Sequence, residues 1–199
     1  MTTPSFLLLR HAEEPADDAT LTLSDRGWQR AGALVRWLAP AGVDAEPAPP
    51  LVRPMRIVAA ASTPEHPSTR PHDTVLPLAQ LLELEVEQPF GSDDDPRRVA
   101  ASLHAPDHAV VVCWRHDALP ALARALLPPD RASQVPPTWP DDRFDLVWAV
   151  HVKQGAWSLT QVPQQLLAGD RASGVVRRVA KGSTTPRGIA HAQEPPGHG

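Results

Sequence analysis

The chain has 199 residues, of which 42% are hydrophobic and 21% are charged. This length suffices for one substantial hydrophobic core and is short for two. The formal net charge of −4 provides no broad basic field of the kind that follows a nucleic-acid backbone, so a nucleic-acid partner is disfavoured. The single cysteine, Cys113, forbids an internal disulfide and suits a reducing compartment, and we therefore expect a cytoplasmic protein.

The first apolar run, Phe6–Leu9, is too short for a signal peptide and is followed closely by acidic residues. No other stretch of the sequence approaches the ~20 apolar residues of a membrane span. We therefore expect neither a targeting segment nor a membrane partner. The sequence carries no indication of the oligomeric state.

Three apolar runs without alternation predict buried strands of a parallel sheet, because such strands are covered on both faces. They are residues 5–9, 56–61 and 110–114, and they end at Arg10-His11, at Ser62 and at Arg115-His116 respectively. Each strand end is therefore followed by polar side chains.

Ser24 is suited to cap the first of three helices that the sequence predicts between these strands. Apolar residues recur at helical spacing over residues 25–38, 71–84 and 119–127. Residues 144–152 and 157–162 predict two further strands joined by a short turn, a hairpin that is most easily placed at a sheet edge. Strands that alternate with helices indicate an α/β fold, here a three-layer sandwich with a mostly parallel central sheet flanked by helices.

The C-terminal part of the chain has a different composition. From Asp170 onward the sequence loses apolar periodicity and gains Gly, Pro, Ser and Thr. A segment of this kind has too little apolar surface to offset the entropy lost on ordering. We therefore predict one catalytic domain over residues 1–170 and a disordered tail over residues 171–199.

The polar residues at the predicted strand ends carry the chemistry. In a parallel sheet the carboxyl ends of the strands meet at one crevice, where ligands bind. There, Arg10 and Arg70 can hold the oxygens of a phosphate group, a protonated His116 adds charge, and a neutral His11 can attack phosphorus in line. Water then hydrolyses the phosphohistidine in the same pocket, and the reaction requires neither a metal nor a cofactor.

The segment Leu7–Glu13, with Leu23, Ser24, Gly27 and Ala31 after it, resembles the opening signature of the histidine phosphatase superfamily. That superfamily includes phosphoglycerate mutases, small phosphohistidine phosphatases, acid phosphatases and phytases. Two later segments are similar to its second and third sequence blocks, in the expected order: residues 61–74 and the strand that ends at His116.

The resemblance implies a phosphoglycerate mutase-like fold and a set of site residues. His11 is the implied nucleophile, and Arg10, Arg70 and His116 form the implied phosphate pocket. Asp117 follows His116 as in the acid phosphatase branch, where such an aspartate protonates the leaving group, so the resemblance also implies a catalytic role for Asp117.

The proton donor stays open between several carboxylates. Asp117 suits an N-cap of the next helix as well as it suits a proton donor. The other candidates are Glu13, Glu14 and the run Asp93–Asp95, of which the run is more typical of a solvated loop or a helix N-terminus. Arg115 is expected to be a surface residue or a salt-bridge partner.

These observations favour a metal-independent phosphatase that acts on a phosphate monoester or a phosphohistidine through an intermediate on His11. The substrate is then a phosphorylated small molecule or a phosphoprotein. One alternative is a catalytically degenerate module that only binds phosphate. Another is a phosphotransferase of the phosphoglycerate mutase type, which is weakened because Ala12 and Glu14 stand where that branch has glycine and a serine or threonine.

Overall fold

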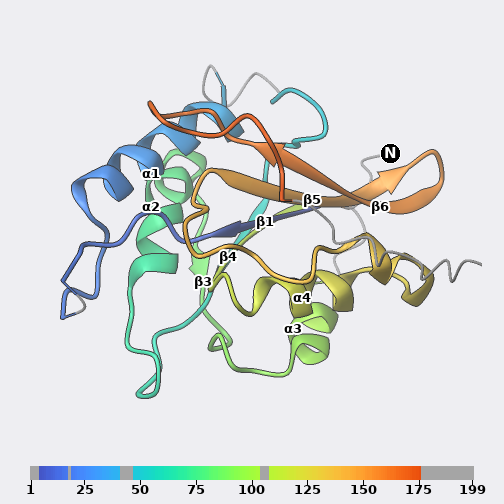
Figure 1. Cartoon of the computed structure of the whole chain (residues 1–199), viewed down its shortest axis with the longest axis horizontal. Helices are drawn as coiled ribbons and strands as arrows, with labels where there is room; N and C mark the ends of the chain where they lie inside the picture. The colour runs from blue at the N-terminus through green and yellow to red at the C-terminus, as the bar shows by residue number, and fades with distance from the viewer. Residues whose placement is uncertain (1–4, 18, 41–46, 104–107, 176–199) are drawn as a thin grey trace, which may run out of the picture.

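The computed structural model describes residues 5–17, 19–40, 47–103 and 108–175 of the chain (Figure 1). The strands are β1 (Ser5–Arg10), β2 (Arg56–Ala59), β3 (Val86–Glu87), β4 (Ala109–Trp114), β5 (Leu146–Lys153) and β6 (Ala156–Pro163). The α-helices are α1 (Asp25–Leu38), α2 (Arg70–Leu82), α3 (Pro96–Leu103) and α4 (Leu119–Leu126), and a 3-10 helix, η1, spans Pro129–Gln134.

The strands form one mixed sheet in the order β3-β2-β4-β1-β5-β6. β1 and β2 both run parallel to β4, and β3 runs parallel to β2. β5 pairs antiparallel with β1 and then with β6, which closes the edge of the sheet as a hairpin. The mostly parallel sheet and the edge hairpin predicted from the sequence are both confirmed.

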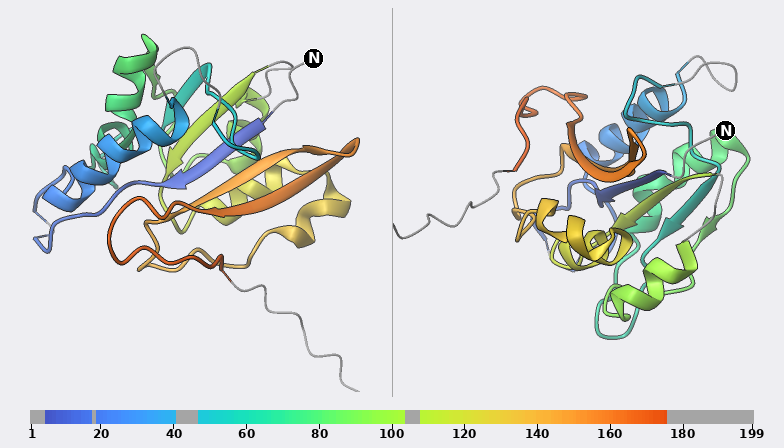
Figure 2. Two further views of the ribbon diagram at one scale, coloured as in Figure 1. Left: turned by 90° about the horizontal axis from the view of Figure 1, so that it is seen from above. Right: turned by 90° about the vertical axis from the view of Figure 1, so that its right-hand side faces the viewer.

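Helices cover both faces of the sheet, α1 and α2 on one and α3 and α4 on the other (Figures 1 and 2). Side chains of β1 alternate between the two layers. Leu7 packs in a core cluster with Leu34 of α1, whereas Leu8 packs in a second cluster with Leu122 of α4. All of β1 is buried, as its unbroken apolar sequence predicts. Within the described residues, no helix is both long enough and apolar enough to cross a membrane.

Most predicted element boundaries agree with the structure to within a few residues. The Ser24 hydroxyl accepts a hydrogen bond from the backbone N–H of Gly27, so the predicted cap of α1 is confirmed. β2 ends at Ala59 rather than residue 61, because Ala61 forms only an isolated bridge to Gly91. β3, α3 and η1 were not predicted from the sequence, because these short elements have too few residues to establish a period.

The segment after residue 170 differs from the predicted tail at its start. The backbone N–H of Arg171 donates to the Asp145 carboxylate at 2.6 Å, and that of Val175 donates to the side-chain oxygen of Gln161 at 2.6 Å. These contacts attach residues 171–175 to β6 and to the segment before β5. The rest of the predicted tail, residues 176–199, lies outside the described residues.

Candidate active site

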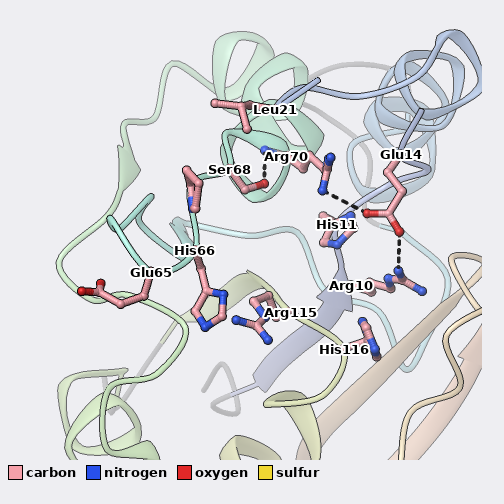
Figure 3. Close-up of a pocket in the computed structure, with 11 residues that line it drawn as sticks. Arg10, His11, Glu14, Leu21, Glu65, His66, Ser68, Arg70, Arg115 and His116 are labelled. Atoms are coloured by element: carbon pink, nitrogen blue, oxygen red, sulfur yellow. Dashed lines mark hydrogen bonds and ion pairs between the residues drawn. The ribbon is translucent and has the colours of Figure 1, made fainter. Parts of the chain in front are cut away.

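A cavity of about 370 Å³ opens at the carboxyl ends of β1, β2 and β4 (Figure 3). Its lining residues are Arg10, His11, Glu14, Leu21, Glu65, His66, Pro67, Ser68, Arg70, Arg115 and His116. The structure thus brings together four of the five site residues expected from the sequence. Asp117 is not part of the lining.

His11 follows β1 directly and is 5% exposed. Its backbone N–H donates to the carbonyl of Trp114 at 3.2 Å, which ties it to the end of β4. Its ring Nδ1 lies 2.8 Å from the carbonyl oxygen of Ala12. Because a carbonyl only accepts, Nδ1 carries the hydrogen, and the lone pair of the neutral ring is on Nε2.

The surroundings of His11 keep the ring neutral. Burial, together with the positive charges of Arg10, Arg70 and His116, lowers the pKa of His11 to about 3, although its hydrogen bond to Ala12 acts in the opposite direction. The imidazole is therefore unprotonated at ordinary pH. A neutral ring with a free Nε2 lone pair is the form in which histidine acts as a nucleophile.

Arg10, the last residue of β1, is 3% exposed. Its guanidinium carbon lies 3.9 Å from the centre of the Phe144 ring, and one NH2 group donates to the backbone carbonyl of Asp141. Its Nε–H has no hydrogen-bond partner among the described residues. Burial lowers the pKa of Arg10, and nearby carboxylates offset this only in part. A donor is therefore left for a ligand.

Arg70 is the first residue of α2, and loop carbonyls hold its side chain in place. Its guanidinium donates to the carbonyl of Thr20 at 2.6 Å and to that of Thr22 at 3.3 Å. The hydroxyl of Thr74, one turn along α2, donates to the Arg70 carbonyl and accepts the backbone N–H of Ala12 at 2.8 Å. This links the start of α2 to the loop after His11.

Glu14 connects the two arginines of the pocket. One carboxylate oxygen accepts from Arg10 at 3.2 Å and the other accepts from Arg70 at 3.0 Å (Figure 3). The Glu14 side chain is 38% exposed. The sequence analysis included Glu14 only among several possible proton donors, and its spacing from Arg70 gave no sign of this contact.

His116 follows β4, with its Nε2 3.0 Å from a carboxylate oxygen of Asp141. Its Nδ1 is buried and has no hydrogen-bond partner in the described part of the chain. Burial and the positive charge of Arg10 lower the pKa of His116, although nearby carboxylates oppose this shift, so the neutral ring is favoured in this state. A bound dianion would oppose that effect and favour protonation on Nδ1.

Asp117 does not line the cavity, and its side chain is 51% exposed. It forms a 2.5 Å ion pair with Arg115, which confirms the expectation that Arg115 is a salt-bridge partner. Burial raises the pKa of Asp117, but the hydrogen bond and charge of Arg115 outweigh burial and lower it. The N-cap of α4 is Ala118 and forms no side-chain cap, so the capping role considered for Asp117 is wrong.

Glu13 is held outside the pocket by a buried ion network. Its carboxylate accepts from Arg30 at 2.7 Å and from Arg26 at 3.0 Å. Arg30 also donates to Asp170 at 2.8 Å and to Gln164 at 2.9 Å. This network secures the segment near residue 170 against α1.

The acidic run 93–95 lies in the loop that leads into α3. Asp93 pairs with His66 at 2.9 Å, and Asp94 accepts the backbone N–H of Gly91 at 2.9 Å. Asp95 accepts the backbone N–H of Arg97 at 2.9 Å, in the first turn of α3. The interpretation of this run as a loop and helix N-terminus is therefore confirmed. Within the described residues, no group of three or more His, Cys, Asp and Glu side chains is arranged to hold a metal ion.

Comparison of the whole fold with solved structures identifies its architecture. The protein histidine phosphatase SixA, solved in complex with tungstate, aligns with a TM-score of 0.51 over 80% of this chain and 97% of its own, at 17% identity. The chain shares the fold of this protein histidine phosphatase. The fold class expected from the sequence resemblance is thereby confirmed.

Two further solved structures, both of phosphatases by their names, align less closely. A putative phosphohistidine phosphatase SixA from Nakamurella multipartitia has a TM-score of 0.46 at 17% identity and covers 80% of this chain and 95% of its own. A mycobacterial glucosyl-3-phosphoglycerate phosphatase in complex with inorganic phosphate has a TM-score of 0.45 at 17% identity and covers 78% of this chain and 95% of its own. No protein-family model and no curated protein sequence matches the chain.

In this histidine phosphatase fold, sequence reasoning missed the outer wall of the pocket. The loop after β2 contributes Glu65, His66 and Ser68, and the loop before α1 contributes Leu21. Arg115 lies on the same wall and donates to the Ser92 hydroxyl at 3.5 Å. Loop residues of this kind have no periodicity, so their position becomes visible only in three dimensions.

Proposed function

We propose that this chain is a metal-independent phosphatase that hydrolyses a phosphate monoester or a phosphohistidine through a phosphohistidine intermediate on His11. The state of His11 carries the proposal. Its Nδ1–H is fixed on the Ala12 carbonyl, its pKa is lowered to about 3, and its Nε2 lone pair is free beside two arginines. This combination suits nucleophilic attack on phosphorus rather than a structural role.

In the first step, Nε2 of His11 attacks phosphorus while the bond to the leaving oxygen breaks. Arg10 and Arg70 balance the charge on the transferred oxygens, and His116, protonated on Nδ1 by the approach of the dianion, adds a further donor. In the second step, water attacks the phosphohistidine and the electron pair returns to Nε2. The charge is supplied by side chains, so the reaction needs no metal ion and no cofactor.

The cavity volume of about 370 Å³ is in the range of small-molecule sites, which favours a phosphorylated small molecule, while its open rim also admits a phosphorylated side chain of a protein.

We propose that the catalytic domain comprises residues 1–170 together with the attached residues 171–175. The lack of a disulfide framework agrees with function in the cytoplasm.

The proposal is tested with His11→Asn, which keeps a donor for the Ala12 carbonyl and removes the nucleophile. Turnover of a nitrophenyl phosphate should fall by at least about a thousandfold, with an unchanged melting temperature. Wild-type protein quenched during turnover should carry an acid-labile phosphoryl group that the variant lacks. A chelator should leave the rate unchanged. Residual turnover above about a tenth of wild type would refute the assignment of His11.

A phosphate-binding module without turnover is the second candidate function. The observation that favours it is the pairing of both arginines with Glu14, which already neutralises part of the pocket's charge. In that case both wild-type protein and His11→Asn bind tungstate with similar affinity in calorimetry, and neither releases phosphate from any monoester. Turnover by the wild-type protein alone excludes this candidate.

A further inference from the structure

The carboxylate of Glu14 occupies the position between Arg10 and Arg70 where an anion is bound most favourably. Its two oxygens accept one hydrogen bond from each arginine, at 3.2 and 3.0 Å, much as two oxygens of a phosphate group would. Of the three guanidinium nitrogens of Arg70, Nε and Nη2 donate to the carbonyls of Thr22 and Thr20, and Nη1 donates to Glu14. A phosphate that takes the position between the two guanidinium groups therefore displaces Glu14.

Displacement changes the surroundings of this carboxylate. Glu14 lies in the pocket lining, and 38% of its side chain is exposed, so it can move aside without leaving the pocket. After displacement it has lost two guanidinium partners and faces a phosphate dianion. A carboxyl group holds a proton more readily beside a dianion than between two guanidinium groups.

The other candidate donors are engaged elsewhere. Glu13 is bound to Arg30, and Asp117, which does not line the cavity, is bound to Arg115, which does. Glu65 lines the cavity but has no charged or hydrogen-bonded partner among the described residues, so the arrival of phosphate does not release it from anything. Among the carboxylates that line the cavity, Glu14 is the one whose ion-pair partners the phosphate takes over.

We propose that Glu14 is the proton donor of this phosphatase: incoming phosphate displaces its carboxylate from Arg10 and Arg70, and the displaced group takes up a proton and gives it to the leaving oxygen. The proposal rests on the proposed function and adds a named acid to it. It assigns Glu14 two successive roles, first as a stand-in for the substrate's phosphate and then as a catalytic acid.

The proton and electron balance is complete. As Nε2 of His11 bonds to phosphorus, the bond between phosphorus and the leaving oxygen breaks, and that oxygen takes the proton of Glu14 to depart as an alcohol. The Glu14 carboxylate then accepts a proton from the water that attacks the phosphohistidine. The N–P bond breaks, its electron pair returns to Nε2, and phosphate leaves with Glu14 protonated again.

The charged groups that face Glu14 come from three elements. Arg10 of β1 and Arg70 of α2 are its ion-pair partners, and His116 after β4 interacts with it electrostatically. A bound dianion also favours protonation of His116, so a proton-uptake experiment must separate His116 from Glu14. A comparison of Glu14→Gln with wild type does so, because both proteins retain His116.

The first experiment compares leaving groups. Glu14→Gln should slow hydrolysis of an alkyl phosphate by about a hundredfold and that of a nitrophenyl phosphate by less than about fivefold, since a nitrophenolate needs little protonation. Asp117→Asn should show no such dependence. Glu65→Gln removes one negative charge from the same cavity and should change both rates equally.

The second experiment measures proton uptake on tungstate binding, by calorimetry in buffers of different ionisation enthalpy near about pH 6. Glu14→Gln should bind tungstate more tightly, because no carboxylate competes for the arginines, and should take up fewer protons than wild type. Glu65→Gln and Asp117→Asn should take up as many protons as wild type. A proton uptake in Glu14→Gln equal to that of wild type, or weaker tungstate binding by this variant, would overturn the proposal.

The outcomes distinguish this proposal from the proposed function. Turnover by the wild type with equal losses on both substrates in Glu14→Gln refutes the donor role and leaves the phosphatase assignment intact. A leaving-group dependence in Asp117→Asn assigns the donor to Asp117 instead. Absence of turnover in the wild type on every monoester refutes the proposed function and the donor role together.

Discussion

Arg10 and Arg30 are two buried arginines that form ion pairs with the neighbouring residues Glu14 and Glu13, and they differ in how completely their N–H groups are hydrogen-bonded. Each has only 2% of its side chain exposed. Arg30 donates to Glu13, Asp170 and Gln164, and although burial lowers its pKa, the hydrogen bonds of the two carboxylates outweigh burial and raise it. Arg10 has a lowered pKa and an unpartnered Nε–H among the described residues.

The difference separates a structural ion network from a ligand site. A buried guanidinium with all its donors satisfied holds parts of the chain together, as Arg30 does between α1 and the segment around Asp170. A buried guanidinium with too few acceptors is costly to the folded state, and that cost is recovered when an anion binds. The comparison therefore favours Arg10 as a ligand-binding residue on physical grounds alone.

Replacement of Arg30 should have the largest effect. Arg30→Met removes the buried cation of this network and leaves Glu13 and Asp170 only the half-exposed Arg26. Loss of one partner of a buried ion network costs about 3–5 kcal/mol. Denaturant unfolding should show this loss in the free energy of unfolding. In Asp170→Asn the Arg30–Glu13 pair remains, so the loss should be smaller. A stability of Arg30→Met within about 1 kcal/mol of wild type would show that the network contributes little.

Replacement of Arg10 should have the opposite pattern. Arg10→Met removes a donor that the transition state requires, so turnover of a nitrophenyl phosphate should fall by about a hundredfold to a thousandfold. Stability should be unchanged or higher, because a poorly paired buried charge is replaced by an apolar side chain. If Arg10→Met is as destabilised as Arg30→Met, the contrast between the two arginines does not hold.

The parts of the molecule that could be predicted from sequence are those with local patterns. Three such patterns can be recognised within a few neighbouring residues: the unbroken apolar run of β1, the helical spacing of α1 and the hydroxyl of Ser24 before α1. The grouping of Arg10 with His116 also followed, because parallel strands end at one edge of a sheet.

The polar pairings between distant segments could not be predicted. Arg30 and Asp170 are separated by 140 positions, and Asp170 lies where the sequence already resembles a tail. Glu14 and Arg70 are 56 positions apart. Each of these ion pairs depends on which of several nearby carboxylates the arginine reaches. Loop conformation decides this, rather than spacing along the chain.

Gly27, in the first turn of α1, packs against the backbone of Glu13, which binds Arg30 and lies two residues after His11. Gly27→Ala tests this contact. A Cβ atom at this position would lie 2.3 Å from the carbonyl oxygen of Glu13, which already accepts the backbone N–H of Ser24 at 3.0 Å. The segment after His11 must shift to admit it, at a cost of about 1–3 kcal/mol in stability. Turnover should fall by roughly tenfold because Glu13 adjoins the catalytic segment. Gly32→Ala, with open space around the new atom, is the matched control.

The smallest expected effect is a pH dependence of stability that arises from His11. Its pKa is lowered to about 3 in the folded chain, chiefly by burial and then by the charges of Arg10, Arg70 and His116, whereas the unfolded chain protonates it near about 6.5. Below that value the unfolded state binds a proton that the folded state excludes, so stability falls as the pH falls. The loss that His11 causes should reach roughly 1.4 kcal/mol at about pH 5.5.

His11→Asn cannot titrate, so the stability of wild type relative to this variant should decrease by that amount between about pH 8 and about pH 5.5. Taking the difference between the two proteins cancels the contributions of all other groups that titrate equally in both. A difference that does not change with pH would mean that His11 is protonated in the folded chain at about pH 5.5, and a protonated ring has no lone pair with which to attack phosphorus.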